Sequence, residues 1–351
     1  MERMDAGMPF LLQYEHVAWY DAGQVRILDR RVYPAQVRFV TCTDYREVVR
    51  AIADMVTQSA GPYTAVGMGM ALAARQARGM GAAEQRAFLT RAAEELAHAR
   101  PTTANRYGQI TRRCAALALQ ALEAGEDPVE AVVRDTIASL NRRYRTMQRV
   151  GDALADLIPG GGAILTQCYG ETVVGAVIRA ARRQGKDFRV FCAETRPYLQ
   201  GARLTASCFA QMGFDTTVIT DGCAAFALER EGISLFTSAA DTIARDGSVA
   251  NKTGTLQLAI LAKYFGVPYY VTGIPDRDKH SRADIVLETR DPEPVLRWGE
   301  GPSHTAPGVK GLYPAFDITP PHLISGVVTD RGVWVPYLLE RYFDGGEAAF
   351  Y

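Results

Sequence analysis

The stretch Gly160-Gly-Gly-Ala-Ile-Leu-Thr-Gln-Cys168 decides the fold class of this chain. Its glycines form a turn, and the residues between them and Cys168 are apolar or β-compatible, which is typical of a buried parallel strand. A second run of this kind, residues 233–240, ends at Asp241. Because ligands bind at the carboxyl ends of the strands in an open α/β sheet, we expect the Cys168 thiol and the Asp241 carboxylate to face one pocket.

Strand-like and helix-like segments alternate around these two runs. The expected strands lie at 163–168, 188–193, 216–220, 233–241 and 268–272. The expected helices lie at 173–184, 203–212, near 224 and at 255–265. Repeated βα units predict a Rossmann-like, doubly wound parallel sheet. Glycines 160–162 precede their strand, whereas the dinucleotide fingerprint places glycines after it, so no nicotinamide or flavin cofactor is expected.

The N-terminal part of the chain has a different pattern. Short β-compatible pieces within residues 17–43 predict a small sheet. Helices are expected at 45–59 with Asp44 as N-cap, at 65–80, at 83–100, from Pro101 onward and at 128–157. The predicted fold is therefore α/β, with a mainly helical N-terminal domain (1–150) that carries a small sheet and a C-terminal catalytic domain (151–351).

Composition excludes several classes of function. The 39 Lys and Arg residues balance 39 Asp and Glu residues, so no net charge attracts nucleic acid or an anionic membrane. No apolar stretch approaches the roughly 20 residues that span a bilayer. The six cysteines form no CxxC pair and the five histidines show no ligand spacing. We therefore expect a cytoplasmic protein with reduced thiols, without a metal site, and without a nucleic-acid or membrane partner.

Three segments combine a cation with an expected helix start, which suits a phosphate group. They are residues 100–105, 194–203 and 251–255. Each signal has a plainer interpretation, because a cation beside a helix start is usually solvated. A free cysteine usually packs as a small apolar residue, and an aspartate after a strand often caps a turn. The joint placement of these residues at strand ends is what favours a binding site.

The same segments resemble methylthioribose-1-phosphate isomerases over nearly the whole chain. The motifs that carry the resemblance are Arg100-Pro-Thr-Thr-Ala-Asn, Leu165-Thr-Gln-Cys168, Glu194-Thr-Arg-Pro-Tyr-Leu-Gln-Gly-Ala-Arg-Leu-Thr-Ala206, Ala240-Asp241-Thr-Ile243, Val249-Ala-Asn-Lys-Thr-Gly-Thr255 and Pro314-Ala-Phe-Asp-Ile-Thr-Pro-Pro321. This family is related to ribose-1,5-bisphosphate isomerase and to the regulatory subunits of the translation factor eIF2B. The resemblance implies a cofactor-free homodimer that isomerises a sugar phosphate, a 5-deoxy or 5-methylthio type of ribose 1-phosphate, to the ribulose 1-phosphate.

The resemblance also implies roles for individual residues. Asp241 is the candidate acid for ring opening and the candidate proton carrier. Cys168 is either its acid/base partner or a stabiliser of charge at C1 and C2, and both an enolate and a hydride shift stay open. The residues implied in binding the substrate and its phosphate are Gln58, Ser59, Ala60, Arg100, Gln200, Asn251 and Lys252.

The chain departs from the family pattern beside these residues. Gln167 and Tyr169 flank Cys168 where the family usually has His and Asn. Thr242 replaces an Arg, and Gln58 stands at the arginine of an Arg-Gly-Ala-Pro loop that here carries one extra residue. The candidate catalytic residues are retained while the residues beside them differ. We therefore predict that methylthioribose 1-phosphate is a poorer substrate than another 5-modified ribose 1-phosphate. The alternative is neutral drift in a true nucleoside or methionine salvage enzyme.

Two other functions stay open at this point. The first is a non-catalytic, ligand-sensing or assembly subunit of the eIF2B type, which has no need for both Cys168 and Asp241. The second is a ribose-1,5-bisphosphate isomerase, whose second phosphate would require a further cation. The missing arginine at Gln58 argues against it.

Overall fold

The computed structural model describes residues 3–100, 104–299 and 301–345, which form two compact units. Among these residues the first unit ends at Arg145 and the second begins at Thr146. This boundary lies within α5 (Pro128–Leu157), the helix in which we predicted the division at residue 150. The exact domain limits stay a prediction.

The N-terminal unit contains a small antiparallel sheet and a helical core. The sheet has the order β1 (Trp19–Asp21), β2 (Gln24–Leu28) and β3 (Phe39–Cys42). The helices are α1 (Tyr45–Ala53), α2 (Gly61–Gln76), α3 (Ala82–Ala97), α4 (Ala104–Glu123) and the first part of α5. Nearly every residue of α2 is buried, so this helix forms the centre of the unit.

The first predicted helix begins as expected and ends early. Asp44 accepts a hydrogen bond from the backbone of Arg46, and the capping box is completed by Glu47. The helix was predicted to reach residue 59, which is wrong. It ends at Ala53 because Met55 adopts a left-handed backbone conformation (φ 61°) that a right-handed helix does not accommodate.

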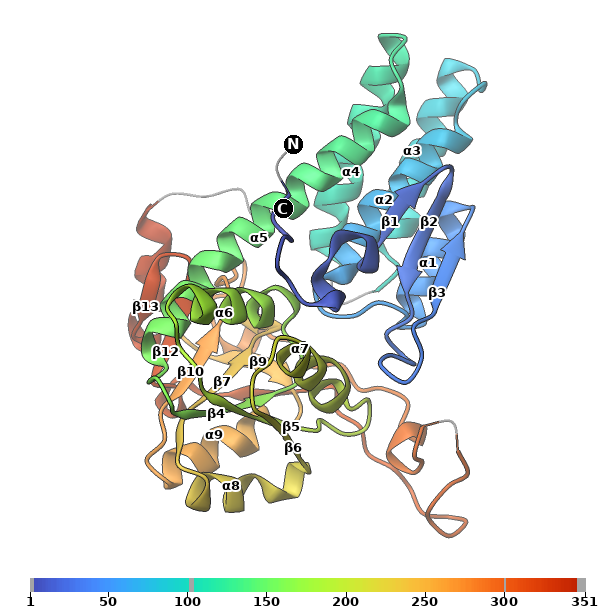
Figure 1. Cartoon of the computed structure of the whole chain (residues 1–351). Coiled ribbons are helices and arrows are strands. Elements are labelled where there is room, and N and C mark those ends of the chain that lie inside the picture. Colours follow the sequence, from blue (N-terminus) through green and yellow to red (C-terminus); the bar gives the residue numbers. More distant parts are fainter. Residues whose placement is uncertain (1–2, 101–103, 300, 346–351) are drawn as a thin grey trace. The chain divides into compact units, whose positions relative to one another are not determined.

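The C-terminal unit is built on a parallel sheet, and this confirms the predicted fold class. Within the described residues the sheet has seven strands in the order β13-β12-β10-β7-β4-β5-β6, of which β13 alone runs antiparallel to its neighbour. The strands are β4 (Ala163–Gln167), β5 (Arg189–Ala193), β6 (Thr216–Ile219), β7 (Ile233–Ala239), β10 (Tyr269–Thr272), β12 (Gly326–Thr329) and β13 (Gly332–Trp334). Helices α6 (Glu171–Arg183) and α7 (Ala206–Gln211) cover one face, and α8 (Ala224–Arg230) and α9 (Thr255–Tyr264) cover the other (Figure 1).

The strand order reverses beside β4. Strands β5 and β6 continue on one side of β4, whereas β7, β10 and β12 continue on the other. Such a reversal is the point at which doubly wound sheets bind ligands, at the carboxyl ends of the two strands that meet there. Here those strands are β4 and β7, in register with Thr166 opposite Thr237. Cys168 and Asp241 therefore leave the sheet from neighbouring strands.

A second small sheet, which the sequence did not predict, follows β7. It has the order β11 (Phe316–Thr319), β9 (Val249–Lys252) and β8 (Thr242–Ile243), all antiparallel. Its strands have two to four residues, and β9 is buried along its whole length despite containing Asn and Lys. Neither length nor polarity marks such segments as strands. This sheet fixes the backbone of the predicted binding residues.

Candidate active site

Cys168 occupies a strained position directly after β4. Its backbone is left-handed (φ 62°), which is uncommon for a residue with a side chain and tends to occur at functional sites. Two threonines stabilise it: the Cys168 N–H donates to Thr195 Oγ1 (2.9 Å), and Thr205 Oγ1 donates to the Cys168 carbonyl (2.5 Å). Cys168 as a whole residue is partly exposed, whereas four other cysteines are buried, namely Cys42, Cys114, Cys192 and Cys208.

The electrostatic environment keeps this thiol protonated. Burial raises the pKa of Cys168 to about 11, while the positive charge of Lys252 lowers it and the negative charge of Asp241 raises it further. Arg290 also acts to lower it. At neutral pH the group is therefore a neutral thiol, able to donate a proton or a hydrogen bond and poorly suited to act as a thiolate nucleophile. These couplings also place Asp241, Lys252 and Arg290 within electrostatic reach of the sulfur.

Asp241 lies between β7 and β8 with its side chain exposed. Its backbone N–H donates to the Ala250 carbonyl (3.0 Å), and the next residue, Thr242, pairs with Ala250 in the small sheet. Asp241 therefore lies beside the strand that ends in Asn251 and Lys252. The structure brings Cys168, Asp241 and these two residues to one edge of the C-terminal unit.

Gln167 ties the strand before the thiol to the turn after Lys252. Its side-chain Nε2 donates to the carbonyls of Lys252 (3.4 Å) and Thr253 (3.1 Å), and its Oε1 accepts from Thr255 Oγ1 (2.8 Å). Asn251 Nδ2 donates to the same Thr255 hydroxyl (3.0 Å). A departure from the family pattern at Gln167 thus has a structural role, which is to fix the backbone of Asn251 and Lys252.

Two backbone amides at the start of α9, a helix start that we expected to suit a phosphate, are engaged by a carboxylate. The Asp317 carboxylate accepts from the backbone of Gly254 (2.7 Å) and of Leu256 (3.1 Å) and so caps the helix. Burial raises the pKa of Asp317 to about 6, although both hydrogen bonds act to lower it. Lys252 is buried, and its Nζ lies 4.5 Å from the centre of the Phe316 ring. An anion at this edge would meet the lysine side chain and not the helix end.

The two arginines of the 194–203 segment, which we expected to bind an anion, make hydrogen bonds within the protein. Arg196 lies over the Trp298 ring (4.2 Å) and donates to backbone carbonyls of residues 294–297. Arg203 donates to the Tyr198 carbonyl (3.0 and 2.6 Å). Asp221 accepts from the backbone of Thr195 (2.9 Å) and Arg196 (2.8 Å). These charges shape the segment and are engaged within the protein.

Gln200 lies at the end of this segment, in front of a π-helical turn, η4 (Gly201–Thr205), that precedes α7. The predicted helix therefore begins earlier than residue 203 and in a different form. A side chain at Gly201 would meet the Ala193 carbonyl at 1.8 Å, so only glycine lets the turn pack against β5. Gln200 is 4% exposed, and its Oε1 has no hydrogen-bond partner among the described residues. A buried acceptor of this kind is suited to a ligand hydroxyl.

The other predicted binding residues belong to the N-terminal unit. Gln58, Ser59 and Ala60 form the turn before α2, in which Ser59 is exposed and left-handed (φ 57°). Two buried arginines fix this turn: Arg30 Nη1 donates to the Gln58 carbonyl (2.8 Å) and Arg143 Nη1 donates to the Ala60 carbonyl (3.1 Å). No local sequence pattern indicates the role of either arginine.

Arg100 follows α3 and is partly buried. The helix start that we predicted at Pro101 lies outside the described residues, which resume at Ala104 within α4.

Arg290 and Tyr313 were not predicted and lie at the same edge as Cys168. The Arg290 side chain is 10% exposed, and its Nε donates to Glu288 Oε1 (2.8 Å). Its backbone N–H donates to the Tyr313 carbonyl (3.0 Å), and its guanidinium lies 5.8 Å from the Phe316 ring centre. Both residues come from the irregular segment between β10 and β11, which has no periodic pattern that sequence reasoning could use.

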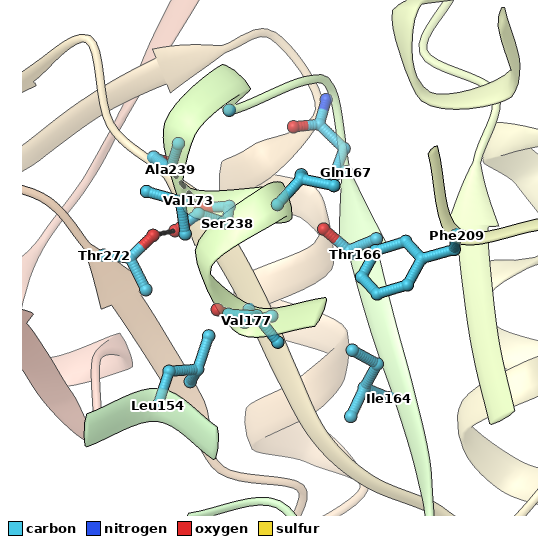
Figure 2. Close-up of a pocket in the computed structure, with 13 residues that line it drawn as sticks. Leu154, Ile164, Thr166, Gln167, Val173, Val177, Phe209, Ser238, Ala239 and Thr272 are labelled. Atoms are coloured by element: carbon cyan, nitrogen blue, oxygen red, sulfur yellow. Dashed lines mark hydrogen bonds between the residues drawn. The ribbon is translucent and has the colours of Figure 1, made fainter. Parts of the chain in front are cut away.

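A small apolar cavity lies behind this edge, between α6 and the sheet (Figure 2). Leu154, Ile164, Val177 and Phe209 surround it, and Thr272 Oγ1 donates to the Ser238 carbonyl (2.9 Å) at its rim. Its volume of about 30 Å³ has room for about two water molecules. Neither Cys168 nor Asp241 lines the cavity. It is therefore too small and wrongly placed to hold a sugar phosphate.

The described part of the chain has neither a metal-binding cluster nor a membrane-spanning helix. No group of three or more His, Cys, Asp or Glu side chains lies close enough to hold a metal ion. No helix there is both long and apolar enough to cross a bilayer.

The chain shares sequence and structure with characterised proteins over nearly its whole length. Residues 61–336 match the initiation factor 2 subunit family. A methylthioribose-1-phosphate isomerase from Chloroflexus aurantiacus is 37% identical, over 91% of this chain and 95% of the relative. The enzyme of the same name from Desulforudis audaxviator is also 37% identical, over 92% and 94%.

Solved structures give the same result and add a second kind of relative. The 5-methylthioribose 1-phosphate isomerase of Pyrococcus horikoshii superposes with a TM-score of 0.81 at 30% identity, covering 96% of this chain and 98% of that one. A protein described as translation initiation factor eIF-2B, subunit delta, from A. fulgidus has a TM-score of 0.78 at 29% identity, covering 93% and 99%. The resemblance predicted from the sequence motifs is confirmed.

Proposed function

Because the chain belongs to the initiation factor 2 subunit family, we propose that it is an aldose–ketose isomerase that converts a 5-modified ribose 1-phosphate to the ribulose 1-phosphate. One observation carries the proposal. Cys168 and Asp241 follow the two strands that meet where the strand order reverses, with Lys252 within electrostatic reach of the thiol. A titratable pair and a cation at such a point suit proton transfer on an anionic substrate.

The proposed reaction moves hydrogen within one molecule. The bond between C1 and the ring oxygen breaks, the ring oxygen gains a proton, a hydrogen passes from C2 to C1, and the C2 hydroxyl loses its proton to become a carbonyl. We assign the ring-opening proton to Asp241 as acid and proton carrier. The environment of Cys168 favours a neutral thiol that donates a hydrogen bond or proton to the oxygens at C1 and C2. Both an enolate and a hydride shift satisfy this balance.

Binding is assigned to the residues that the resemblance indicated. Asn251, Lys252 and Gln200 are proposed to contact the sugar phosphate from the C-terminal unit. Gln58, Ser59, Ala60 and Arg100, which belong to the N-terminal unit, keep the binding role that the family resemblance implies. Lys252 supplies the positive charge for the phosphate through its side chain, since Asp317 occupies the adjacent helix amides.

The substituent at C5 is a separate proposal. The relatives are named for methylthioribose 1-phosphate, whereas Gln58, Tyr169 and Thr242 depart from the family pattern beside retained residues. We expect another 5-modified ribose 1-phosphate to be turned over at least about tenfold better, the scale set by a methylene-sized pocket change. The fourth departure, Gln167, is bonded to the turn after Lys252, so its difference from the family pattern is explained without a role in C5 specificity.

The test is a turnover panel of ribose 1-phosphates that differ only at C5, assayed as ketose 1-phosphate formed. Wild type is compared with Cys168→Ser and Asp241→Asn. Turnover that is lost in both variants supports the isomerase, and first rank for the methylthio compound would show that the departures are drift. First rank for ribose 1,5-bisphosphate would support that isomerase instead. Binding without turnover of any member would support a ligand-sensing subunit, the class to which the eIF-2B relative's name points.

We also propose a homodimer in the cytoplasm, in nucleoside or methionine salvage. The basis is the family resemblance, the balanced charge and the absence of a CxxC pair from the sequence. Light scattering on the purified protein tests the dimer, since a mass of about 38 kDa instead of twice that value would contradict it.

A further inference from the structure

Tyr313 has a buried hydroxyl whose proton finds no acceptor among the described residues. The residue is 4% exposed, and a side-chain hydrogen bond from Arg290 acts on the pKa of its hydroxyl. Because an arginine can only donate, no described residue accepts the O–H proton itself. Two other buried tyrosines have hydrogen-bond partners: Tyr269 bonds Ser238 Oγ (2.7 Å) and Tyr144 bonds the Leu12 carbonyl (2.8 Å). Since buried hydroxyls are normally paired, one whose proton has no acceptor at a candidate site points to a ligand.

The surroundings of Tyr313 are those of the candidate site. The hydroxyl is coupled electrostatically to the Cys168 sulfur and to the Arg290 guanidinium. Its ring meets the Tyr198 ring edge to face at 5.9 Å, and Tyr198 belongs to the same segment as Gln200. Three residues further on, β11 begins at Phe316, which is paired with Lys252. Thiol, lysine and tyrosine thus belong to one cluster in the C-terminal unit.

The chemistry of the group defines what it can do. Burial raises the pKa of the Tyr313 hydroxyl, so it stays a neutral phenol at physiological pH and can donate one hydrogen bond. The nearby positive charge of Arg290 acts in the opposite direction and makes the phenol a better donor. An oxygen of a bound sugar, which gains electron density during isomerisation, is the natural acceptor.

We propose that Tyr313 is a further substrate-contacting residue, whose hydroxyl donates a hydrogen bond to the C2 oxygen of the pentose phosphate held beside Cys168. This inference rests on the proposed function, because it needs a pentose 1-phosphate at that site. Through this contact, the segment before β11 takes a direct part in recognising the sugar. C2 is chosen because its oxygen changes from hydroxyl to carbonyl next to the thiol.

Tyr313→Phe tests the contact because it removes one oxygen atom and keeps the ring that packs on Tyr198. The matched control is Tyr269→Phe, which removes a buried hydroxyl that is already bonded within the sheet. We expect Tyr313→Phe to lower kcat/KM for the preferred pentose 1-phosphate about 3- to 10-fold without lowering Tm. Tyr269→Phe should lower Tm and leave kcat/KM unchanged.

A second measurement identifies the oxygen. Binding of ribose 1-phosphate and of 2-deoxyribose 1-phosphate is measured by calorimetry for wild type and Tyr313→Phe. The substitution should weaken binding of ribose 1-phosphate several-fold and leave binding of the 2-deoxy compound unchanged, because the contact is already missing there. Equal losses for both ligands would show that the hydroxyl does not reach the C2 oxygen and would overturn the assignment.

The outcomes separate this inference from the function on which it rests. Turnover and binding that are identical in wild type and Tyr313→Phe would overturn the role of Tyr313 and leave the isomerase intact. Binding without turnover by wild type would refute the isomerase, while the comparison of the two ligands would still decide the contact. If wild type binds neither ligand, both proposals are refuted.

Discussion

Replacing Gln167 by Leu should loosen the backbone of Lys252, the lysine proposed to bind the substrate, without altering the Cys168 thiol or the Asp241 carboxylate. The Gln167 side chain is 3% exposed and bonds the turn that follows β9 at three points, two carbonyls and one hydroxyl. Leucine has a similar size and fits a buried strand, so the change removes the hydrogen bonds and little else. We expect the C-terminal unit to lose stability and the substrate to bind more weakly.

The size of the effect follows from the bonds that are lost. Two of the three have good geometry, the donation to the Thr253 carbonyl (3.1 Å) and the acceptance from Thr255 Oγ1 (2.8 Å). Because the single Thr255 hydroxyl proton is shared between Gln167 Oε1 and the Lys252 carbonyl, and each full bond is worth about 1 kcal/mol, the loss costs about 1–2 kcal/mol. Thr255 keeps the Lys252 carbonyl at 2.7 Å as a partner, whereas the Thr253 carbonyl loses Gln167. With that penalty the unfolding free energy should fall by about 2–3 kcal/mol.

Urea unfolding measures the stability change, and steady-state kinetics with phosphate as competitive inhibitor measures the effect on binding. KM should rise about 3- to 10-fold and phosphate inhibition should weaken in parallel, with a smaller change in kcat, because Asn251 and Lys252 lose their support. Gln167→His is the matched variant, since an imidazole offers one donor and one acceptor and is the family's usual residue. An unchanged KM and phosphate inhibition in Gln167→Leu would refute the positioning role.

Three further predictions concern titratable groups. Cys168→Ser and Asp241→Asn should each lower kcat by at least about 100-fold, measured by steady-state kinetics, and should change substrate binding far less, measured by calorimetry. Near-wild-type turnover in either variant would show that the replaced residue is not part of the mechanism. At pH 8, iodoacetamide should alkylate the exposed Cys223 well before Cys168. The alkylation rate of Cys168, followed by peptide mass spectrometry, should increase as the pH approaches its pKa of about 11. If Cys168 reacted first, its thiol could not be protonated at this pH. Burial raises the pKa of Asp317 from 3.8 to about 6, so the folded state binds the proton of this carboxyl more tightly than the unfolded state does. Protonated Asp317 therefore adds up to about 3 kcal/mol to the free energy of unfolding. This contribution is present below pH 4 and is lost as the pH rises through 6. Asp317→Asn should therefore flatten the decline of the unfolding free energy over this range, and a slope equal to that of wild type would contradict the assignment.

The parts of the fold that follow from local pattern were predictable. Strands β4 and β7 are buried apolar runs followed by helices, and their hydrophobic pattern alone indicates a parallel sheet. Once the sheet is parallel, residues that follow its strands must meet at one edge, so Cys168 and Asp241 could be selected before any resemblance was used. Helix α1 was predictable at its start for the same reason, since Asp44 and Glu47 form a capping box within the local sequence.

The remaining part of the site depends on contacts that no local pattern contains. Gly254 is capped by Asp317, 63 residues later, so the helix start that looked free in sequence is filled by a carboxylate. Strand β9 carries Asn and Lys in fully buried positions, which hydrophobicity alone assigns to a surface loop.

Lys252 shows why such residues escape prediction. A buried ammonium group is tolerated because other parts of the chain surround it: the Phe316 ring lies 4.5 Å from its Nζ, and the carbonyls of its turn are bonded by Gln167. Each partner is unremarkable in sequence, and only the pairing of β9 with β11 brings the lysine and the ring together. Topology therefore identifies the candidate reacting groups from sequence, whereas the groups that orient and compensate them become visible only once the chain has folded.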